Sequence, residues 1–152
     1  MNKIKLGKQD VIHFIGIGGI GMSGLAQIMK TMGFKVQGSD VNKNKNTDNC
    51  KKLGIKILIG HNKKNINKVT IVVKSSAIKP NNVELVESKK KNMPIYDRIE
   101  MLANIIDLKK KIIITGSHGK TTTTSLVAKI ISAAKLDPTI INGGVINSLK
   151  NN

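Results

Sequence analysis

The chain has 152 residues, of which 39% are apolar, so it can bury a core and holds one domain or one domain with part of a second. Its formal net charge is +17, but it has a single arginine and only 2% aromatic residues, which favours a solvated lysine-rich surface over a nucleic-acid-binding face. One cysteine excludes an intrachain disulfide, and without a signal-peptide core or an apolar run near about 18 residues the sequence predicts a cytoplasmic chain with no membrane contact.

The part of the chain before residue 108 alternates apolar runs with amphipathic stretches. Strands are predicted at 11–17, 34–38, 55–59, 69–73 and 94–96, and helices at 21–32, 50–53, 82–92 and 98–106. In the helix at 82–92, Val83, Leu85 and Val86 are expected to face the core. Strands that alternate with helices indicate an α/β fold with a parallel sheet.

After residue 108 the pattern starts again. Three lysines at 109–111 form a charged hinge, and a strand at 112–115, a helix at 121–134 and a strand at 139–141 are predicted to follow. We therefore place a domain boundary at residue 108, which gives domains at 1–108 and 109–152. The second domain is expected to be truncated or a docked appendage, because two strands and one helix bury too little surface to be stable alone.

The first glycine-rich loop follows the first predicted strand and opens the first helix. Its sequence, Gly16-Ile17-Gly18-Gly19-Ile20-Gly21, fits the pattern G-x-G-x-x-G. These glycines allow a tight turn, close approach of the backbone to a pyrophosphate, and close helix packing. Asp40 follows at the end of the second strand, where an acid can accept hydrogen bonds from a ribose. The pattern indicates NAD or a nucleoside-diphosphate sugar, and a tight turn without a ligand is the alternative.

A second glycine-bearing loop, Gly116-Ser117-His118-Gly119-Lys120-Thr121-Thr122, precedes the helix at 121–134. Gly-Lys-Thr is typical of the end of a P-loop, in which backbone N–H groups surround phosphates, the lysine reaches the β and γ phosphates and the threonine hydroxyl can bind Mg²⁺. The standard motif has a glycine where this chain has Ile114, so the loop is a shortened variant. The threonine run is a poor helix former, which favours a functional reason for it.

Together these motifs resemble the Mur ligase family. The shortened second loop is similar to the ATP-binding loop of these enzymes. The resemblance runs from about residue 11 to residue 146, in the family's order, through 13–24, Gly38-Ser39-Asp40, Ser75-Ser76-Ala77-Ile78, Arg98-Ile99-Glu100-Met101-Leu102 and Asn142-Gly143-Gly144. The branch that ligates L-alanine to UDP-N-acetylmuramate is the best match, and the branch that recycles muramyl peptides ranks second.

The resemblance implies a fold and a reaction. The fold would be a Rossmann-like five-stranded parallel sheet at 1–108 that binds UDP-N-acetylmuramate, followed by the beginning of a P-loop α/β ATP-binding domain at 109–152. In the reaction of this branch, ATP phosphorylates the muramate carboxylate, the amine of L-alanine attacks the acyl phosphate, and phosphate leaves. The product serves peptidoglycan synthesis in the cytoplasm, and the implied cofactors are ATP and Mg²⁺.

The resemblance also implies roles for particular residues. Residues of the first loop and of two strand ends would bind the UDP-sugar: Gly18, Gly19, Ile20, Gly21, Asp40, Ser75 and Ser76. Residues of the second loop would bind ATP: Gly116, Ser117, His118, Gly119, Lys120, Thr121 and Thr122. Lys120 and His118 are the expected catalytic residues, and Thr121 is the expected Mg²⁺ ligand.

Four further side chains are judged from their own sequence context. Arg98 and Glu100 are expected to form a structural pair, with contact to the substrate as the alternative, and His13 in an apolar strand is expected to be a satisfied core histidine. Cys50 is expected to be inert. His61, which follows Gly60, stays open between a structural and a functional role.

The chain departs from the family in one respect. In the family, the central domain continues and supplies an acidic Mg²⁺ ligand and a histidine, and a third domain helps to bind ATP and the amino acid. We therefore expect this chain to bind UDP-N-acetylmuramate but not to turn it over alone. Two other classes stay open, a small NAD-binding regulatory module and a basic nucleic-acid-binding protein, whose affinity would fall steeply with salt.

Overall fold

The computed structural model describes residues 4–142 and 145–148. The chain forms two compact units, Met1–Lys109 and Lys110–Asn152.

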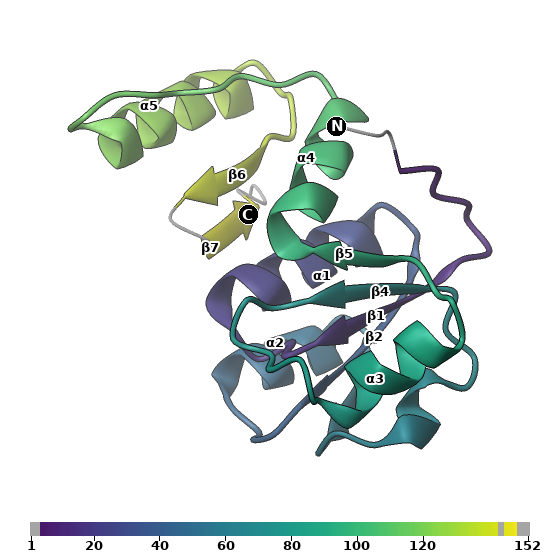
Figure 1. The fold of residues 1–152 in the computed structure, drawn as a ribbon. Coiled ribbons are helices and arrows are strands. Elements are labelled where there is room, and N and C mark those ends of the chain that lie inside the picture. Colours follow the sequence, from purple (N-terminus) through teal and green to yellow (C-terminus); the bar gives the residue numbers. More distant parts are fainter. Residues whose placement is uncertain (1–3, 143–144, 149–152) are drawn as a thin grey trace. The chain divides into compact units, whose positions relative to one another are not determined.

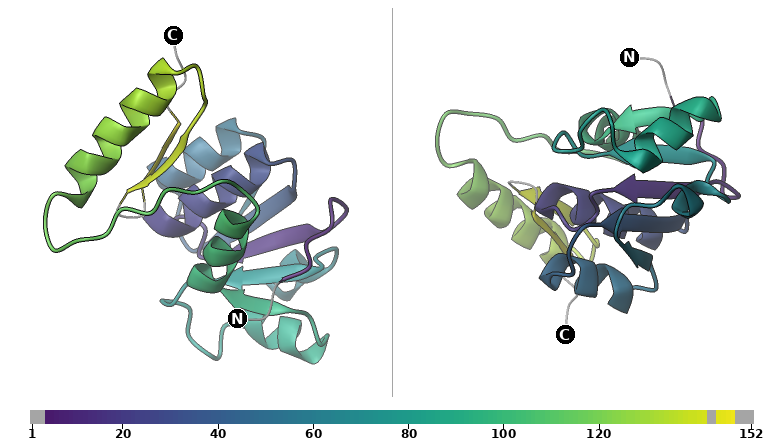
Figure 2. Two further views of the ribbon diagram at one scale, coloured as in Figure 1. Left: turned by 90° about the horizontal axis from the view of Figure 1, so that it is seen from above. Right: turned by 60° about the horizontal axis from the view of Figure 1, so that its bottom comes forward.

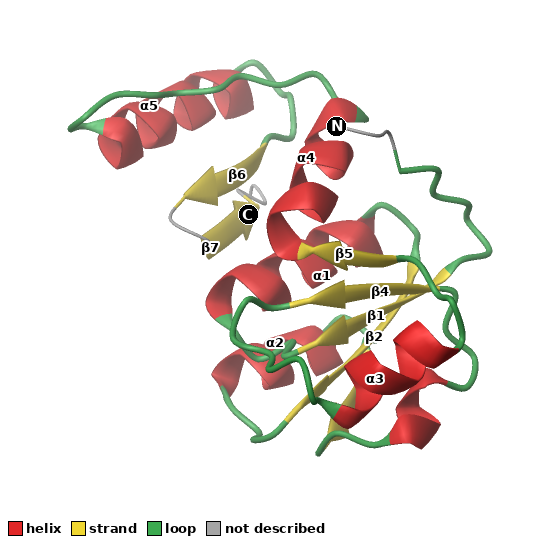
Figure 3. Cartoon of the chain, in the orientation of Figure 1, coloured by secondary structure: helices red, strands yellow, loops and turns green. Residues whose placement is uncertain are grey.

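A parallel sheet forms the centre of the first unit. Within the described residues it has five strands in the order β3-β2-β1-β4-β5 (Figure 1). The strands are β1 (Val11–Ile15), β2 (Lys35–Asp40), β3 (Lys56–Ile59), β4 (Ile71–Lys74) and β5 (Ile95–Asp97). The connections contain α1 (Ile20–Thr31), α2 (Lys45–Lys52), the 3-10 helix η1 (Lys63–Ile66), α3 (Val83–Lys90) and, after β5, α4 (Arg98–Asp107). Figure 3 shows strand and helix alternating along this unit, so the predicted α/β fold is confirmed.

Helices cover both faces of the sheet. α1 packs against α2 and α4, whereas α3 packs against η1 on the other side (Figure 2). Successive side chains of a strand point to opposite faces. In β1, Ile15 packs into a buried cluster with Ile66, Val72 and Leu85 beneath α3 and η1, and Phe14 faces the other way. Burial of both faces explains why β1 and β4 are so rich in apolar residues.

The buried face of α3 differs from the prediction. Asn82 caps the helix by accepting hydrogen bonds from the N–H groups of Glu84 and Leu85. With this start, the inward face of α3 carries Glu84, Leu85 and Ser88, and Val83 is 40% exposed. The prediction that Val83 faces the core was wrong because a buried carboxylate takes the inward position next to it.

The second unit is smaller than the sequence pattern suggests. It contains α5 (Lys120–Ala133) and the antiparallel pair β6 (Thr139–Asn142) and β7 (Val145–Ser148). The strand predicted at 112–115 is absent, and Ile112 and Ile113 are 66% and 74% exposed. A strand needs a partner for its N–H and C=O groups, and in the described part of the chain no segment pairs with these residues. Parallel pairing in this unit was therefore predicted wrongly, and β7 was not predicted.

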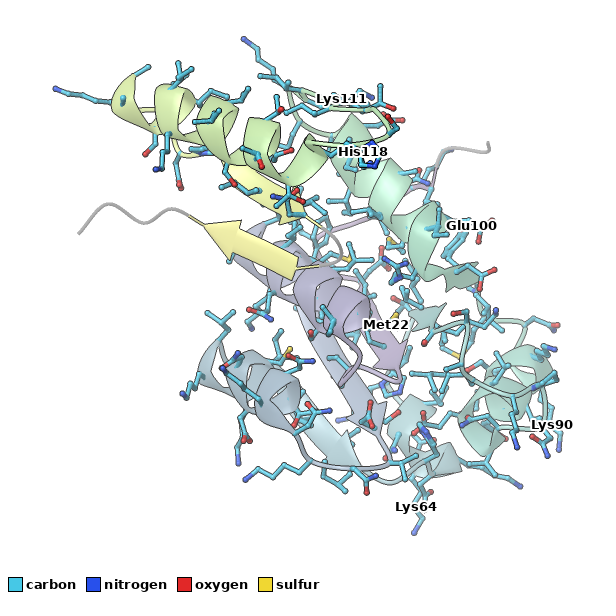
Figure 4. All side chains as sticks on the ribbon, turned by 90° about the vertical axis from the view of Figure 1, so that its left-hand side faces the viewer. Met22, Lys64, Lys90, Glu100, Lys111 and His118 are labelled. Carbon is cyan, nitrogen blue, oxygen red and sulfur yellow. The ribbon has the colours of Figure 1, made fainter. Side chains whose placement is uncertain are left out.

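Lysines account for the high charge of the chain. Lys64 and Lys90 lie exposed on the outside of the first unit (Figure 4), as a solvated lysine-rich surface requires. In the described ranges, no helix is long and apolar enough to cross a membrane.

Candidate functional site

The strand order of the first unit reverses between β1 and β4, and the first glycine-rich loop begins there. In an open α/β sheet, ligands bind at such a reversal, beyond the carboxyl ends of the strands. Gly16 follows β1 with a φ of +83°, and a Cβ at this position would stand 3.2 Å from the Cβ of Ser75, which follows β4. The Ser75 N–H donates to the carbonyl of Ile15 (3.1 Å). Glycine at position 16 therefore lets the loop turn tightly against the end of β4.

Backbone hydrogen bonds hold the loop to the end of β2. The N–H groups of Gly16 and Ile17 both donate to the carbonyl of Ser39, at 2.9 and 3.0 Å. The Gly18 N–H donates to Oδ2 of Asp40 (2.7 Å). Asp40 therefore shapes the loop in this structure, and its contact with a ribose stays a prediction.

The start of α2 supports the loop from the other side. The Gly18 carbonyl accepts from Nδ2 of Asn44 (3.2 Å) and from Nδ2 of Asn46 (2.8 Å). A Cβ on Gly18 would stand 2.7 Å from Nδ2 of Asn44 and 2.8 Å from Oδ2 of Asp40. Gly18 thus has both its polar groups engaged and no room for a side chain.

The amino end of α1 offers free donors beside this loop. The first N–H groups of a helix have no intrahelical acceptor and carry partial positive charge, and here they belong to Ile20, Gly21 and Met22. Gly19, the N-cap residue, supplies no side-chain cap, and the first turn holds no acidic residue. This helix end is therefore suited to bind an anion.

Arg98 lies over the same helix end, a position that fits its alternative role as a substrate contact and not the structural pair that the sequence favoured. A Cβ on Gly21 would stand 2.8 Å from Nη1 of Arg98, so the guanidinium occupies the space beside the first turn of α1. The expected pair with Glu100 is not formed, because Oε2 of Glu100 accepts from the N–H of Asp97 (2.9 Å) in the capping box of α4. The sequence feature that could have drawn attention to this position is that the chain's single arginine directly follows the end of a strand, β5.

The two predicted serines lie at the end of β4. The Ser75 hydroxyl accepts from the N–H of Ala77 (3.3 Å), which forms a local turn, and its side chain is half-buried next to Gly16. Ser76 is exposed. Ser75 is therefore brought to the glycine-rich loop, and Ser76 lies on the surface at the same edge of the sheet.

A buried carboxylate lies beneath the carboxyl edge of the sheet, and the sequence did not single it out. Oε2 of Glu84 accepts from the Ser39 hydroxyl (2.5 Å) and lies 3.3 Å from Nε2 of His13 and 3.2 Å from Nδ1 of His61. Oε1 accepts from Nδ2 of Asn65 (2.5 Å) and from the N–H of Asn62 (3.2 Å). Burial raises the pKa of Glu84, but the hydrogen bonds from His13, Ser39 and Asn65 outweigh it and lower the pKa to about 2. Glu84 is therefore an ionised acceptor at neutral pH.

His13 is fully buried and has partners on both ring nitrogens. Its Nδ1 lies 3.1 Å from Nε2 of Gln37, and the same amide donates to the carbonyl of Asn65 (2.9 Å). Since this amide nitrogen is a donor, Nδ1 of His13 accepts and Nε2 donates to Glu84. The prediction of a satisfied core histidine is confirmed.

Cys50 is fully buried in α2, and its thiol donates to the carbonyl of Ser23. Burial raises its pKa to about 11, although a hydrogen bond with Gln27 acts in the other direction. Only the thiolate is a good nucleophile. We expect iodoacetamide at pH 8 to alkylate the folded chain about 100-fold more slowly than the urea-denatured chain, measured by mass spectrometry. Equal rates would show that the thiol is accessible.

The second loop lies exposed at the start of α5. Gly119, the N-cap residue, has a φ of +75°, and the first turn of α5 holds no acidic residue. Nζ of Lys120 donates to the carbonyls of Gly116 (2.5 Å) and Ser117 (3.0 Å), so the lysine folds back over the loop. His118 is exposed (Figure 4). This loop brings together a lysine and a helix start without a side-chain cap. Both supply positive charge and N–H donors, which suits the loop to bind a phosphate group.

The fit to Mg²⁺ is partial. Thr121 stands one residue into α5, where its hydroxyl could be one ligand. Among the residues that the structure describes, no group of three or more His, Cys, Asp or Glu side chains could hold a metal ion. The described residues therefore offer a phosphate-binding loop but no complete Mg²⁺ site.

Comparison with known proteins identifies relatives over nearly the whole chain. The model of the "Mur ligase family, catalytic domain" matches residues 11–110. The UDP-N-acetylmuramate–L-alanine ligase of Pelagibacter ubique is 69% identical over 149 residues, which are 98% of this chain and 32% of that protein. The enzyme of the same name from Aquifex aeolicus is 54% identical over 92% of this chain and 31% of its own length. The chain thus spans about a third of the length of these relatives.

Solved structures agree with these relatives. The UDP-N-acetylmuramate–alanine ligase of Thermotoga maritima superposes with a TM-score of 0.76 at 36% identity, over 87% of this chain and 31% of that one. The UDP-N-acetylmuramate:L-alanyl-γ-D-glutamyl-meso-diaminopimelate ligase of Neisseria meningitides gives a TM-score of 0.79 at 29% identity, over 92% of this chain and 46% of that one. From its glycine-rich loop, its sheet and these matches, the chain belongs to the Mur ligase family.

Proposed function

We propose that this chain is the nucleotide-sugar-binding part of an ATP-dependent ligase that joins L-alanine to UDP-N-acetylmuramate in peptidoglycan synthesis. The observation that carries the proposal is the meeting of the glycine-rich loop, the uncapped start of α1 and Arg98 at the strand reversal. A pyrophosphate needs such a concentration of N–H donors and positive charge. Relatives named for this reaction support the choice of ligand.

Each part of the proposed ligand has a candidate partner. The pyrophosphate would accept hydrogen bonds from the free amides of Ile20 and Gly21 and from the Arg98 guanidinium, with Gly18 and Gly19 shaping the backbone around it. Asp40 would accept from the ribose. Ser75 and Ser76 would face the sugar across the strand reversal, because they stand on the other side of the Gly16 turn.

The second loop would bind ATP. Lys120 would leave the carbonyls of Gly116 and Ser117 to neutralise the γ-phosphate, while backbone N–H groups from Ser117 to Thr122 surround the phosphates. His118 would contact phosphate or substrate, and Thr121 would contribute one ligand to Mg²⁺. Because the described residues hold no complete Mg²⁺ site, we propose that the chain alone binds the UDP-sugar without turning it over.

Calorimetric titration of the purified chain with UDP-N-acetylmuramate and with NAD tests this function. We expect the UDP-sugar to bind and NAD not to compete with it. NAD binding in the absence of UDP-sugar binding would instead support a dinucleotide-binding regulatory module. Phosphate release that depends on L-alanine, catalysed by the chain alone, would contradict the proposed inactivity.

Replacement of Arg98 by alanine tests the pyrophosphate position. Loss of one charge-assisted contact is expected to weaken UDP-N-acetylmuramate binding about tenfold, measured by the same calorimetry. Lys52→Ala is the control, because it removes one exposed positive charge at the far end of α2; its affinity should stay within about twofold of the unmutated chain. Equal effects of the two substitutions would mean that Arg98 acts only through net charge.

A further inference from the structure

His61 lies at the same edge of the sheet as the glycine-rich loop, on the side of β2 and β3. The N–H of Gly60 donates to the main-chain carbonyl of Asp40 (2.8 Å), and Asp40 lies opposite Ile59 in the sheet. Along this edge, the glycine-rich loop is followed by Asp40 and then by His61. A nucleoside joined to a pyrophosphate at α1, with its ribose at Asp40, would extend toward His61.

Hydrogen bonding sets which nitrogen of His61 carries a proton. Nδ1 lies 3.2 Å from Oε2 of Glu84 and 3.2 Å from Oγ of Ser39, and the Ser39 hydroxyl proton is already donated to Glu84. An ionised carboxylate only accepts hydrogen bonds. Nδ1 must therefore carry the hydrogen, and in the neutral ring Nε2 is left as an acceptor.

The acceptor nitrogen of His61 is not used inside the unit. Nδ1 points into the buried cluster, and the side chain keeps 15% of its surface exposed. Among the described residues, no hydrogen bond to Nε2 is present. The ring is thus anchored at one nitrogen and available at the other.

We propose that Glu84 positions His61 so that its Nε2 accepts a hydrogen bond from the nucleoside of the bound UDP-sugar. The proposal rests on the proposed function, because it takes the nucleotide to lie at this edge. Two groups of a uridine have the required chemistry, the N3–H of the uracil ring and the ribose hydroxyls. Recognition of the uracil N3–H would also select against cytosine, whose N3 is an acceptor. His61 is then a binding residue, and Glu84 is a positioning residue that acts through it.

His61→Asn isolates the proposed contact. The asparagine amide can replace Nδ1 as the donor to Glu84, but nothing replaces Nε2. The probes are UDP, CDP, 2′-deoxy-UDP and 3′-deoxy-UDP, titrated calorimetrically into the full chain. We expect the substitution to weaken UDP binding about tenfold. If uracil is the donor, the substitution will leave the affinity for CDP unchanged. If a ribose hydroxyl is the donor, it will weaken CDP binding as much as UDP binding, and it will not weaken binding of the deoxy analogue that lacks this hydroxyl.

Glu84→Gln tests the positioning role. A glutamine amide can donate to Nδ1, which would move the ring hydrogen to Nε2 and turn the acceptor into a donor. We expect the affinity for UDP to fall severalfold. If His61 contacts uracil, the preference for UDP over CDP will also shrink. If His61 contacts the ribose, the affinities for UDP and CDP will fall together. Ser88→Ala is the matched control, because Ser88 is equally buried in α3 and its hydroxyl donates to the main-chain carbonyl of Glu84 and not to the carboxylate. Thermal unfolding of each variant confirms that it folds.

The outcomes separate this inference from the proposed function. If the unmutated chain binds UDP and His61→Asn binds all four probes as tightly as the unmutated chain does, the contact with His61 is refuted. If Glu84→Gln leaves both affinity and base preference unchanged, Glu84 has no positioning role. If the unmutated chain does not bind UDP or UDP-N-acetylmuramate, the proposed function fails and this inference fails with it.

Discussion

Glu84→Ala is expected to lower the free energy of unfolding of the first unit by about 3–5 kcal/mol, because buried hydrogen-bond donors lose the carboxylate that accepts from them. Truncation removes the acceptor of the Ser39 hydroxyl and of the His13 Nε2–H, and one of the two acceptors of the Asn65 amide. Urea denaturation measures the change. The fluorescence of Tyr96, the chain's single tyrosine, reports on this unit because Tyr96 lies in β5.

Glu87→Ala is the matched control for this prediction. Glu87 lies on the same helix, keeps 21% of its side chain exposed and forms a 3.5 Å ion pair with Lys91. Its removal is expected to cost about 0.5 kcal/mol or less. If Glu84→Ala also costs less than about 1 kcal/mol, the buried cluster does not stabilise the fold.

The same carboxylate predicts an acid-sensitive part of the stability. The pKa of Glu84 is lowered in the folded state from 4.5 to about 2. Its ionised form therefore stabilises the fold above about pH 4.5, and this contribution is lost as pH falls toward 2. We expect urea midpoints to decline over this range in the unmutated chain more than in Glu84→Gln. Parallel declines would assign the acid sensitivity to other carboxylates.

Gly21→Leu is expected to weaken UDP-N-acetylmuramate binding by roughly 100-fold or more. A Cβ at position 21 would stand 2.8 Å from Nη1 of Arg98, so the leucine side chain would fill the space that the guanidinium now occupies. It would then stand between the guanidinium and the free amides of α1. Both sources of positive charge would be lost to the pyrophosphate. Calorimetry gives the affinity, and circular dichroism shows whether the helix is retained.

Gly19→Ala is the comparison for this substitution. Gly19 has ordinary dihedral angles (φ −65°, ψ 144°), and a Cβ there meets nothing closer than the Gly16 carbonyl at 3.6 Å. Alanine keeps the N–H group, so the loss of affinity should be much smaller than at position 21. A loss as large at position 19 would place the pyrophosphate against Gly19 instead of beside Arg98.

The fold of the first unit was predictable because its signals are local. Apolar runs, a glycine-rich turn and intervening amphipathic stretches specify strands and helices from neighbouring residues alone. The segment at 112–115 shows the limit of this reasoning. Its apolar, β-branched sequence predicts a strand, yet strand formation depends on a partner elsewhere in the chain, and a local pattern does not report on that partner.

The residues of the candidate site also fall into those that the sequence could predict and those that it could not. The glycine-rich loop and Asp40 were recognisable because their roles follow from their order along the chain. For Arg98 the sequence offered substrate contact only as the alternative to a structural pair, and it did not single out Glu84, because both positions depend on α4 and α3 packing against segments far away in sequence. Glu84 in particular lies in a polar helix, where a carboxylate is ordinarily solvated, and only the packing of α3 beneath Ser39 and His13 gives it partners.

The central place of β1 in the sheet has a consequence for how the chain folds during synthesis. Of the five strands of the sheet β1 is made first, but one of its two neighbours, β4, follows much later: Ile12 pairs with Ile71, which stands 59 residues further along. While that length of chain is still being made, one edge of an apolar strand stays unpaired and open to aggregation. Slower translation between β3 and β4 would lengthen this interval, so the yield of folded protein should depend on the rate at which the ribosome passes this stretch.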